Sequence, residues 1–289
     1  MKMVSILNTL DSGHGEDIQD IQVDYYGLMM ATCSSDRLIK IFNLKTQELI
    51  ADLNGHFGPV SQLSWAHPKF GCILASCSFD KRIIIWKEDH GWIKMNEFIL
   101  SSPAACIEFA PYHCGLRLAC GSTDGKISIL SFENGVWDMK KIQGHLLGCN
   151  SLSWDPTSNG SRYLATGGCD SCIKIWEENS SGWEEVAKLD VHQDWVLDVA
   201  WSPSTTVNMI ASCSNDKTVI INTSTDKKNW TSKLLHSFPD AVCGVTWDQN
   251  ILAVTTANKK VYLWKENPSG QWICMSESDV HSSDHNLHS

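Results

Sequence analysis

A segment of about 44 residues recurs six times along this 289-residue chain, and this recurrence limits the possible folds more than any other feature. The six copies are ATCSSDRLIKIF, ASCSFDKRIIIW, ACGSTDGKISIL, ATGGCDSCIKIW, ASCSNDKTVIIN and AVTTANKKVYLW. Their equivalent residues, the anchors, lie 44, 44, 46, 46 and 42 residues apart and are Asp36, Asp80, Asp124, Asp170, Asp216 and Asn258. A repeat of this length is typical of a blade in a β-propeller.

Each copy carries the signals of two strands joined by a tight turn. Small residues precede the anchor, and apolar residues alternate after it, as at Ile83 and Ile85, which is the period of a strand. An apolar strand precedes each copy and another strand follows a polar hairpin, so each repeat has four strands. No window shows a helical apolar stripe. The sequence predicts an all-β, six-bladed propeller with blades at about 15–55, 56–100, 101–143, 144–190, 191–237 and 238–276, and a disordered polar tail at 277–289.

Gly-His pairs and turn aspartates resemble the WD repeat. Pairs such as Gly55-His56 stand about 24 residues before an anchor, which often has Ser or Thr four residues earlier and Trp six residues later. The resemblance implies a buried hydrogen-bond network in the blade, and because the same groups recur, they are structural and not a hydrolytic triad. The expected network residues are His56, Ser76, Asp80 and Trp86 in blade 2, His145, Thr166, Asp170 and Trp176 in blade 4, and His192, Ser212 and Asp216 in blade 5. Blades 3 and 6 lack the His.

One strand is left over when the strands are counted. Segment 3–11, MVSILNTLD, stands where every later repeat has a fourth strand, but six complete blades already use residues 15 to about 276. Either the six blades close by themselves and this strand adds to an edge, or a second polypeptide donates three strands and completes a seventh blade. For the second arrangement we expect the partner to bind along Met3, Val4, Ile6, Asn8 and Leu10.

Several longer strings resemble the Sec-thirteen family of short WD-repeat proteins. They include MVSILNTLD, GPVSQLSWAHP, ILASCSFDKRIIIW and HQDWVLDVAWSPS, and the resemblance runs from about residue 3 to 276. It implies a scaffold subunit whose open propeller receives a blade from a large helical partner, the Sec-thirty-one subunit of the COPII vesicle cage or a nucleoporin of the nuclear pore Y-complex. It further implies participation in a lysosomal nutrient-signalling complex. The implied locations are the cytoplasmic face of the endoplasmic reticulum, COPII vesicles, the nuclear envelope and the cytosol.

A self-closed adaptor that reads peptide motifs, in a ubiquitin ligase, a chromatin reader or another complex, stays open as the alternative. Catalysis is not expected, because Asp20, Glu108 and Asp198 stand isolated on the first strands of their blades. No motif for a cofactor or a metal appears, and the Cys169–Cys172 pair has no second pair to complete a zinc site.

Charge and hydropathy exclude further classes. With 23 Lys and Arg against 33 Asp and Glu, the formal charge is −10, so nucleic acid is not an expected direct partner. The apolar stretches are far shorter than the roughly 20 residues of a transmembrane helix, and the start of the chain does not match a signal peptide. Cys33, Cys77 and Cys213 are expected to be buried free thiols, because each stands three residues before an anchor.

Overall fold

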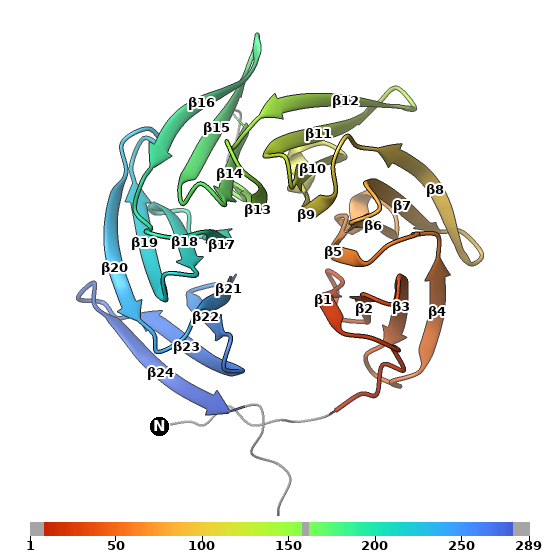
Figure 1. Ribbon diagram of the computed structural model, residues 1–289, viewed down its shortest axis with the longest axis horizontal. Coiled ribbons are helices and arrows are strands. Elements are labelled where there is room, and N and C mark those ends of the chain that lie inside the picture. The colour runs from red at the N-terminus through yellow and green to blue at the C-terminus, as the bar shows by residue number, and fades with distance from the viewer. Residues whose placement is uncertain (1–8, 158–161, 280–289) are drawn as a thin grey trace, which may run out of the picture. The chain divides into compact units, whose positions relative to one another are not determined.

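The computed structural model describes residues 9–157 and 162–279, and its elements form six four-stranded antiparallel sheets. The fold is an all-β, six-bladed β-propeller, which confirms the predicted class (Figure 1). The described chain divides into a first compact unit, residues 10–154, and a second unit that contains Thr9 and the residues from Asp155 onward. No helix among the described residues has the length and apolarity that crossing a bilayer requires.

The first unit contains three complete blades and one further strand. Blade 1 has β1 (Ile18–Val23), β2 (Met29–Ser34), β3 (Leu38–Asn43) and β4 (Leu49–Asn54). Blade 2 has β5 (Val60–Trp65), β6 (Ile73–Ser78), β7 (Arg82–Glu88) and β8 (Trp92–Ile99), with the 3₁₀ turn η1 (Pro68–Phe70) after β5. Blade 3 has β9 (Ala104–Phe109), β10 (Arg117–Ser122), β11 (Lys126–Glu133) and β12 (Val136–Gln143), with η2 (Tyr112–Cys114) after β9. The further strand is β13 (Cys149–Trp154).

The second unit contains the remaining strands. After β13, blade 4 continues with β14 (Arg162–Gly168), β15 (Ile173–Asn179) and β16 (Gly182–Leu189). Blade 5 has β17 (Val196–Trp201), β18 (Asn208–Ser214), β19 (Thr218–Ser224) and β20 (Thr231–Ser237), and blade 6 has β21 (Val242–Asp248), β22 (Ile251–Thr256), β23 (Lys260–Glu266) and β24 (Trp272–Asp279). β24 extends three residues past the strand end expected at 276, because Lys260 at the start of β23 pairs with Asp279. Residues 280–289 of the expected tail lie outside the described residues.

The anchors set the turn between the second and third strands of the blades. In blade 2 the Asp80 carboxylate accepts a hydrogen bond from the Arg82 N–H at 2.9 Å, and the next residue, Lys81, has a left-handed φ of 70°. Arg37, Gly125, Ser171, Lys217 and Lys259 take the same conformation after the other anchors. At Gly125 a side chain is also excluded by space, because a Cβ would lie 2.2 Å from the His145 carbonyl oxygen.

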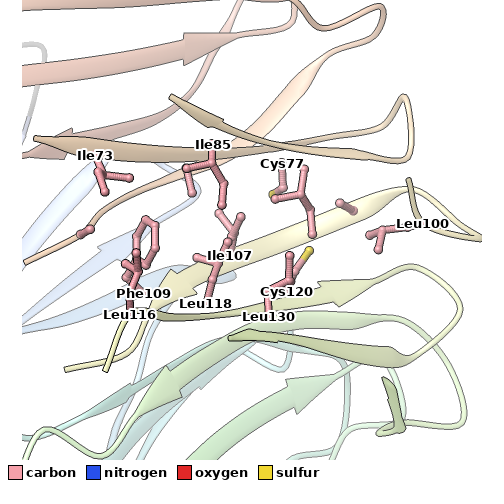
Figure 2. Close-up of a cluster of buried hydrophobic side chains, with 14 residues drawn as sticks. Ile73, Cys77, Ile85, Leu100, Ile107, Phe109, Leu116, Leu118, Cys120 and Leu130 are labelled. Carbon is pink, nitrogen blue, oxygen red and sulfur yellow. The ribbon is translucent and has the colours of Figure 1, made fainter. Parts of the chain in front are cut away.

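The hydrophobic core of each unit lies between successive blades. Figure 2 shows the layer between blades 2 and 3, where Ile73, Cys77 and Ile85 face Ile107 and Leu118. Similar buried clusters join blades 1 and 2 in the first unit and blades 5 and 6 in the second. Since the second strand is buried on both faces, it needs small residues, and Cys33, Cys77 and Cys213 are fully buried free thiols, as predicted.

Candidate functional site

The network predicted for blade 2 forms a continuous chain of hydrogen bonds. His56 Nδ1 lies 3.0 Å from an Asp80 carboxylate oxygen, and His56 Nε2 lies 2.7 Å from the Ser76 hydroxyl. Trp86 Nε1 donates to the same hydroxyl at 2.9 Å. A carboxylate only accepts, so Nδ1 carries the imidazole proton, and the Ser76 hydroxyl then donates to Nε2 while it accepts from Trp86. The buried side-chain polar atoms of this blade 2 network therefore each have a partner.

Other blades repeat parts of this hydrogen-bond network. In blade 5, His192 Nδ1 lies 3.0 Å from Asp216 and Nε2 lies 2.9 Å from the Ser212 hydroxyl. Blade 1 has the equivalent pair of contacts, from His14 to Asp36 at 2.8 Å and to Thr32 at 2.9 Å.

The network residues predicted for blade 4 belong to both units. In the second unit Trp176 Nε1 donates to the Thr166 hydroxyl at 3.0 Å, and the Cys172 thiol donates to the Asp170 carboxylate at 3.0 Å. His145 belongs to the first unit, where its side chain is buried and its backbone N–H donates to the Gly125 carbonyl at 2.8 Å.

Blades that lack the His substitute other contacts. In blade 3 the anchor Asp124 accepts from Ser122 at 2.6 Å and from Ser101 at 3.2 Å, and the buried thiol of Cys120 replaces the central hydroxyl. In blade 6 the Thr256 hydroxyl donates to Asn258 at 2.6 Å. These turns are therefore fixed by local hydrogen bonds, and no histidine joins them to the preceding loop.

The pKa values in these networks predict a stability that falls with acidity. Burial lowers the pKa of His192 from 6.5 despite the opposing charge of Asp216, so the folded chain binds this proton less readily than the unfolded chain. Burial alone would raise the pKa of Asp80, but hydrogen bonds from His56 and from the N–H groups of Phe57 and Arg82 lower it overall. Both groups therefore stabilise the native state at neutral pH. The His192 contribution is lost as pH falls below about 6.5, and that of the anchor carboxylates below about 4.

Urea unfolding between pH 7.5 and 5 measures the first of these losses. We expect the free energy of unfolding to decrease over this interval, and the decrease to be smaller in His192→Gln, which removes the titrating group. His90 lies exposed in a hairpin turn, so His90→Gln is the matched control and should keep the parent slope. A His192→Gln slope equal to that of the parent would contradict the assignment.

The isolated carboxylates of the first strands have a shared structural role that the sequence prediction missed. Asp20 accepts a hydrogen bond from the Leu63 N–H at 2.9 Å, and Asp198 accepts one from the Val245 N–H at 2.9 Å. Glu108 accepts from the Trp154 N–H at 3.0 Å. Each carboxylate thus holds the first strand of the next blade, so the three residues that the sequence shows as isolated share a contact that repeats along the chain. Burial raises the pKa of Asp20, although three hydrogen bonds oppose the shift.

Uncharged residues extend the same series of contacts. Gln62 accepts from the Ile107 N–H at 2.7 Å, in the place that Asp20 and Asp198 hold in their blades. In the opposite direction, the indoles of Trp65, Trp154 and Trp247 donate to first-strand carbonyls of the preceding blade at 3.0 to 3.1 Å. In blade 6 the equivalent position is Gly244, so β21 offers no side-chain acceptor there. The sequence signal was an Asp or Gln directly before an apolar residue in the first strands of blades 1, 2 and 5.

Blade 1 exposes apolar side chains that are buried elsewhere. By strand pairing, Ile21 corresponds to Leu63, Ile107, Val199 and Val245. Ile21 is 51% exposed, whereas the four equivalents are at most 5% exposed. Ile18 is 41% exposed and Val23 is 49% exposed on the same strand. We call Ile18, Ile21 and Val23 the blade 1 apolar row.

The position of this row on the sheet explains its exposure. Asp20 reaches blade 2, and because side chains alternate along a strand, Ile21 and Val23 point to the opposite face of blade 1. No blade of the same unit precedes β1 and covers that face. Of the residues predicted to bind a partner, Met3, Val4, Ile6 and Asn8 lie outside the described residues, whereas Leu10 is described, half-buried and outside any strand.

Comparisons with known proteins agree with the repeats and with the fold. The family model "WD domain, G-beta repeat" matches residues 4–43, 47–87, 137–177 and 183–221. The stretches without a match contain most of blades 3 and 6, the blades without the His. Human "Protein SEC13 homolog" is 48% identical over 95% of this chain and 94% of its own length. The chain belongs to the SEC13 family.

Other relatives give the same result. The SEC13 homolog of Drosophila melanogaster is 44% identical over 94% of this chain and 83% of its own length. "Protein transport protein sec13" of Emericella nidulans is 42% identical over 91% of the chain and 95% of its own. Among solved structures, a chain of "Crystal Structure of Mitotic Checkpoint Complex" superposes with a TM-score of 0.73 over 86% of this chain and 74% of that one. At 18% identity this likeness shows the fold alone.

Within each unit taken by itself, the described residues contain no cluster of three His, Cys, Asp or Glu side chains that could hold a metal ion. The feature that most distinguishes blade 1 from its equivalents is its exposed face, which carries the blade 1 apolar row.

Proposed function

We propose that this chain is a non-enzymatic scaffold subunit of protein-transport coats. Several of its relatives are named protein transport proteins. Hydrogen-bond networks in its fold stabilise blades and join neighbouring blades. In the proposed role a large helical partner adds a β-blade to the face of blade 1 that carries the blade 1 apolar row. Its exposure, against the burial of equivalent residues, is the observation that carries the proposal.

Membership of the SEC13 family supports a proposal for the partner and for the location. We propose a Sec-thirty-one-type subunit of the COPII cage and a nucleoporin of the Y-complex as the donors of the blade, with a lysosomal nutrient-signalling complex as a further assembly. The corresponding locations are the cytoplasmic face of the endoplasmic reticulum, its vesicles and the nuclear envelope, and the chain reaches the membrane only through the coat. A self-closed adaptor is not favoured, because several relatives of this chain carry transport names.

Charges placed in the blade 1 apolar row test this mode of binding. The chain would be produced with the amino-terminal segment of the helical partner, and affinity measured by biolayer interferometry. We expect Ile21→Asp with Val23→Asp to weaken binding at least tenfold, since an unpaired carboxylate would be buried in the interface. Val136 is 68% exposed in the strand β12 of blade 3, so Val136→Asp is the matched control and should leave the affinity unchanged.

Two results would contradict the proposal. Because Ile21 and Val23 are exposed in this chain, the double variant should keep the thermal unfolding midpoint of the parent. If this folded variant binds the partner normally, the face of blade 1 is not the binding site. Deleting residues 1–11 should also weaken binding, and an unchanged affinity would show that the leftover strand takes no part.

A further inference from the structure

Five aromatic side chains form a continuous row across three blades of the first unit. In order they are Tyr26, Tyr25, His67, Tyr112 and His113, and we call them the aromatic row. Successive ring centroids lie 5.3, 4.8, 4.8 and 5.7 Å apart. The rings come from the β1–β2, β5–β6 and β9–β10 connections, so three equivalent turns bring them together.

Hydrogen bonds and glycine conformations fix each of these turns. The Asp24 carboxylate accepts from the N–H groups of Leu28 and Met29 at 2.6 and 2.7 Å. The 3₁₀ turns η1 and η2 end at glycines with φ of 97° and 83°, Gly71 and Gly115. Rings on fixed turns lose little further conformational entropy when a ligand binds, so the aromatic row is preorganised.

The polar groups of the aromatic row are available to a ligand. Tyr25, Tyr26 and Tyr112 are 67%, 65% and 50% exposed, and nothing in the described part of the chain hydrogen-bonds to their hydroxyls. His67 Nδ1 accepts from the Lys69 N–H at 3.1 Å, so neutral His67 carries its proton on Nε2. The aromatic row therefore presents ring faces together with several hydrogen-bond donors.

The two ends of the aromatic row differ in charge. Asp24 directly precedes Tyr25, and the Lys69 ammonium lies 5.6 Å from the Tyr112 ring centroid. A complementary ligand therefore carries a positive charge at one end and a negative charge at the other.

We propose that the aromatic row binds a proline-rich segment of another protein in the polyproline II conformation, with a basic residue at the Asp24 end and an acidic residue at the Lys69 end. Proline rings pack on aromatic faces, and the backbone carbonyls of this helix have no internal partners, so they accept from tyrosine hydroxyls and from His67 Nε2. The two 4.8 Å steps set an upper limit on the distance from the Tyr25 ring to the Tyr112 ring, and this limit is close to the ~9 Å of one polyproline II turn. Single-stranded RNA also stacks on aromatic rings, but the chain charge of −10 opposes it.

Fluorescence anisotropy with labelled synthetic peptides tests this proposal. The probe is the octapeptide Arg-(Pro)₆-Glu, and Ser-(Pro)₆-Ser and a glycine-serine peptide of equal length are the comparisons. We expect the charged probe to bind more tightly than the serine-ended peptide, and the glycine-serine peptide not to bind. Tyr25→Ala with Tyr112→Ala should weaken binding of the charged probe at least tenfold, whereas Leu146→Ala, at a residue that is 87% exposed in another loop, should not change it.

A second pair of variants tests the charges without removing the rings. In Asp24→Asn with Lys69→Gln the Asn side-chain oxygen still accepts from the turn, and the preference for the charged probe should disappear. Three outcomes would each overturn the proposal. In the first, the parent binds neither proline peptide up to 1 mM. In the second, binding survives the loss of Tyr25 and Tyr112 in a variant that circular dichroism shows to be folded. In the third, the parent binds oligouridine but no proline peptide.

Discussion

Replacing Lys227 by methionine is expected to lower the free energy of unfolding by about 3 to 5 kcal/mol. The Lys227 ammonium forms an ion pair with Asp155, whose side chain is fully buried. It also lies 4.6 Å from the Tyr163 ring centroid and 6.0 Å from that of Trp201. Methionine keeps the packing of the stem on these rings but removes the charge, so the Asp155 carboxylate stays buried without its counter-ion. Urea denaturation at pH 7.5 measures the loss.

A double-mutant cycle separates the ion pair from the rest of the loop. Asp155→Ala alone leaves the Lys227 charge poorly solvated and also removes the hydrogen bonds from Thr157, at 2.8 and 2.9 Å. The double variant should cost clearly less than the sum of the two single variants, because neither charge remains. Lys228 has a side chain that is 60% exposed, so Lys228→Met should change stability by less than about 0.5 kcal/mol. Additive costs in the cycle would show that the pair is not coupled.

The blade architecture could be predicted from the sequence because every blade needs the same turn and the same buried strand. The residue after each anchor adopts a left-handed φ, and the strand before the anchor needs small, buried residues. The same residue types therefore recur at regular spacing, with Asp80, Asp170 and Asp216 as anchors. The contacts between blades did not follow in the same way. Asp20, Gln62 and Glu108 differ in side chain although each accepts from a backbone N–H of the next blade, and residue identity alone conceals a shared role.

Features that depend on loops from different blades were also invisible. The aromatic row joins Tyr25, His67 and Tyr112, which are more than 40 residues apart in sequence, and no periodicity marks them as neighbours. The exposure of Ile21 is a different case. Its apolar character fits the period of a buried strand, and only its place in the first blade of a unit leaves it uncovered.

The second large effect is expected for His56→Ala, which should lower the free energy of unfolding by about 3 kcal/mol or more. His56 is fully buried and joins the Asp80 carboxylate to the Ser76 hydroxyl. Its removal leaves a cavity and deprives both groups of a partner. Trp86→Phe removes one indole donor but keeps most of the ring, so its cost should be smaller, about 1 to 2 kcal/mol.

The order of these losses distinguishes a connected network from a set of separate contacts. Once His56 is alanine, Ser76 has already lost one partner, so adding Ser76→Ala should cost less than it does in the parent. His90→Ala, at an exposed turn, should leave stability within about 0.5 kcal/mol of the parent. Blade 3 folds without this histidine because Ser101 and Ser122 satisfy its anchor directly. In blade 2 the Asp80 carboxylate also accepts from the N–H groups of Phe57 and Arg82, so the cost of His56→Ala measures what the imidazole adds to these bonds. Equal costs for His56→Ala and His90→Ala would refute a stabilising role for the imidazole.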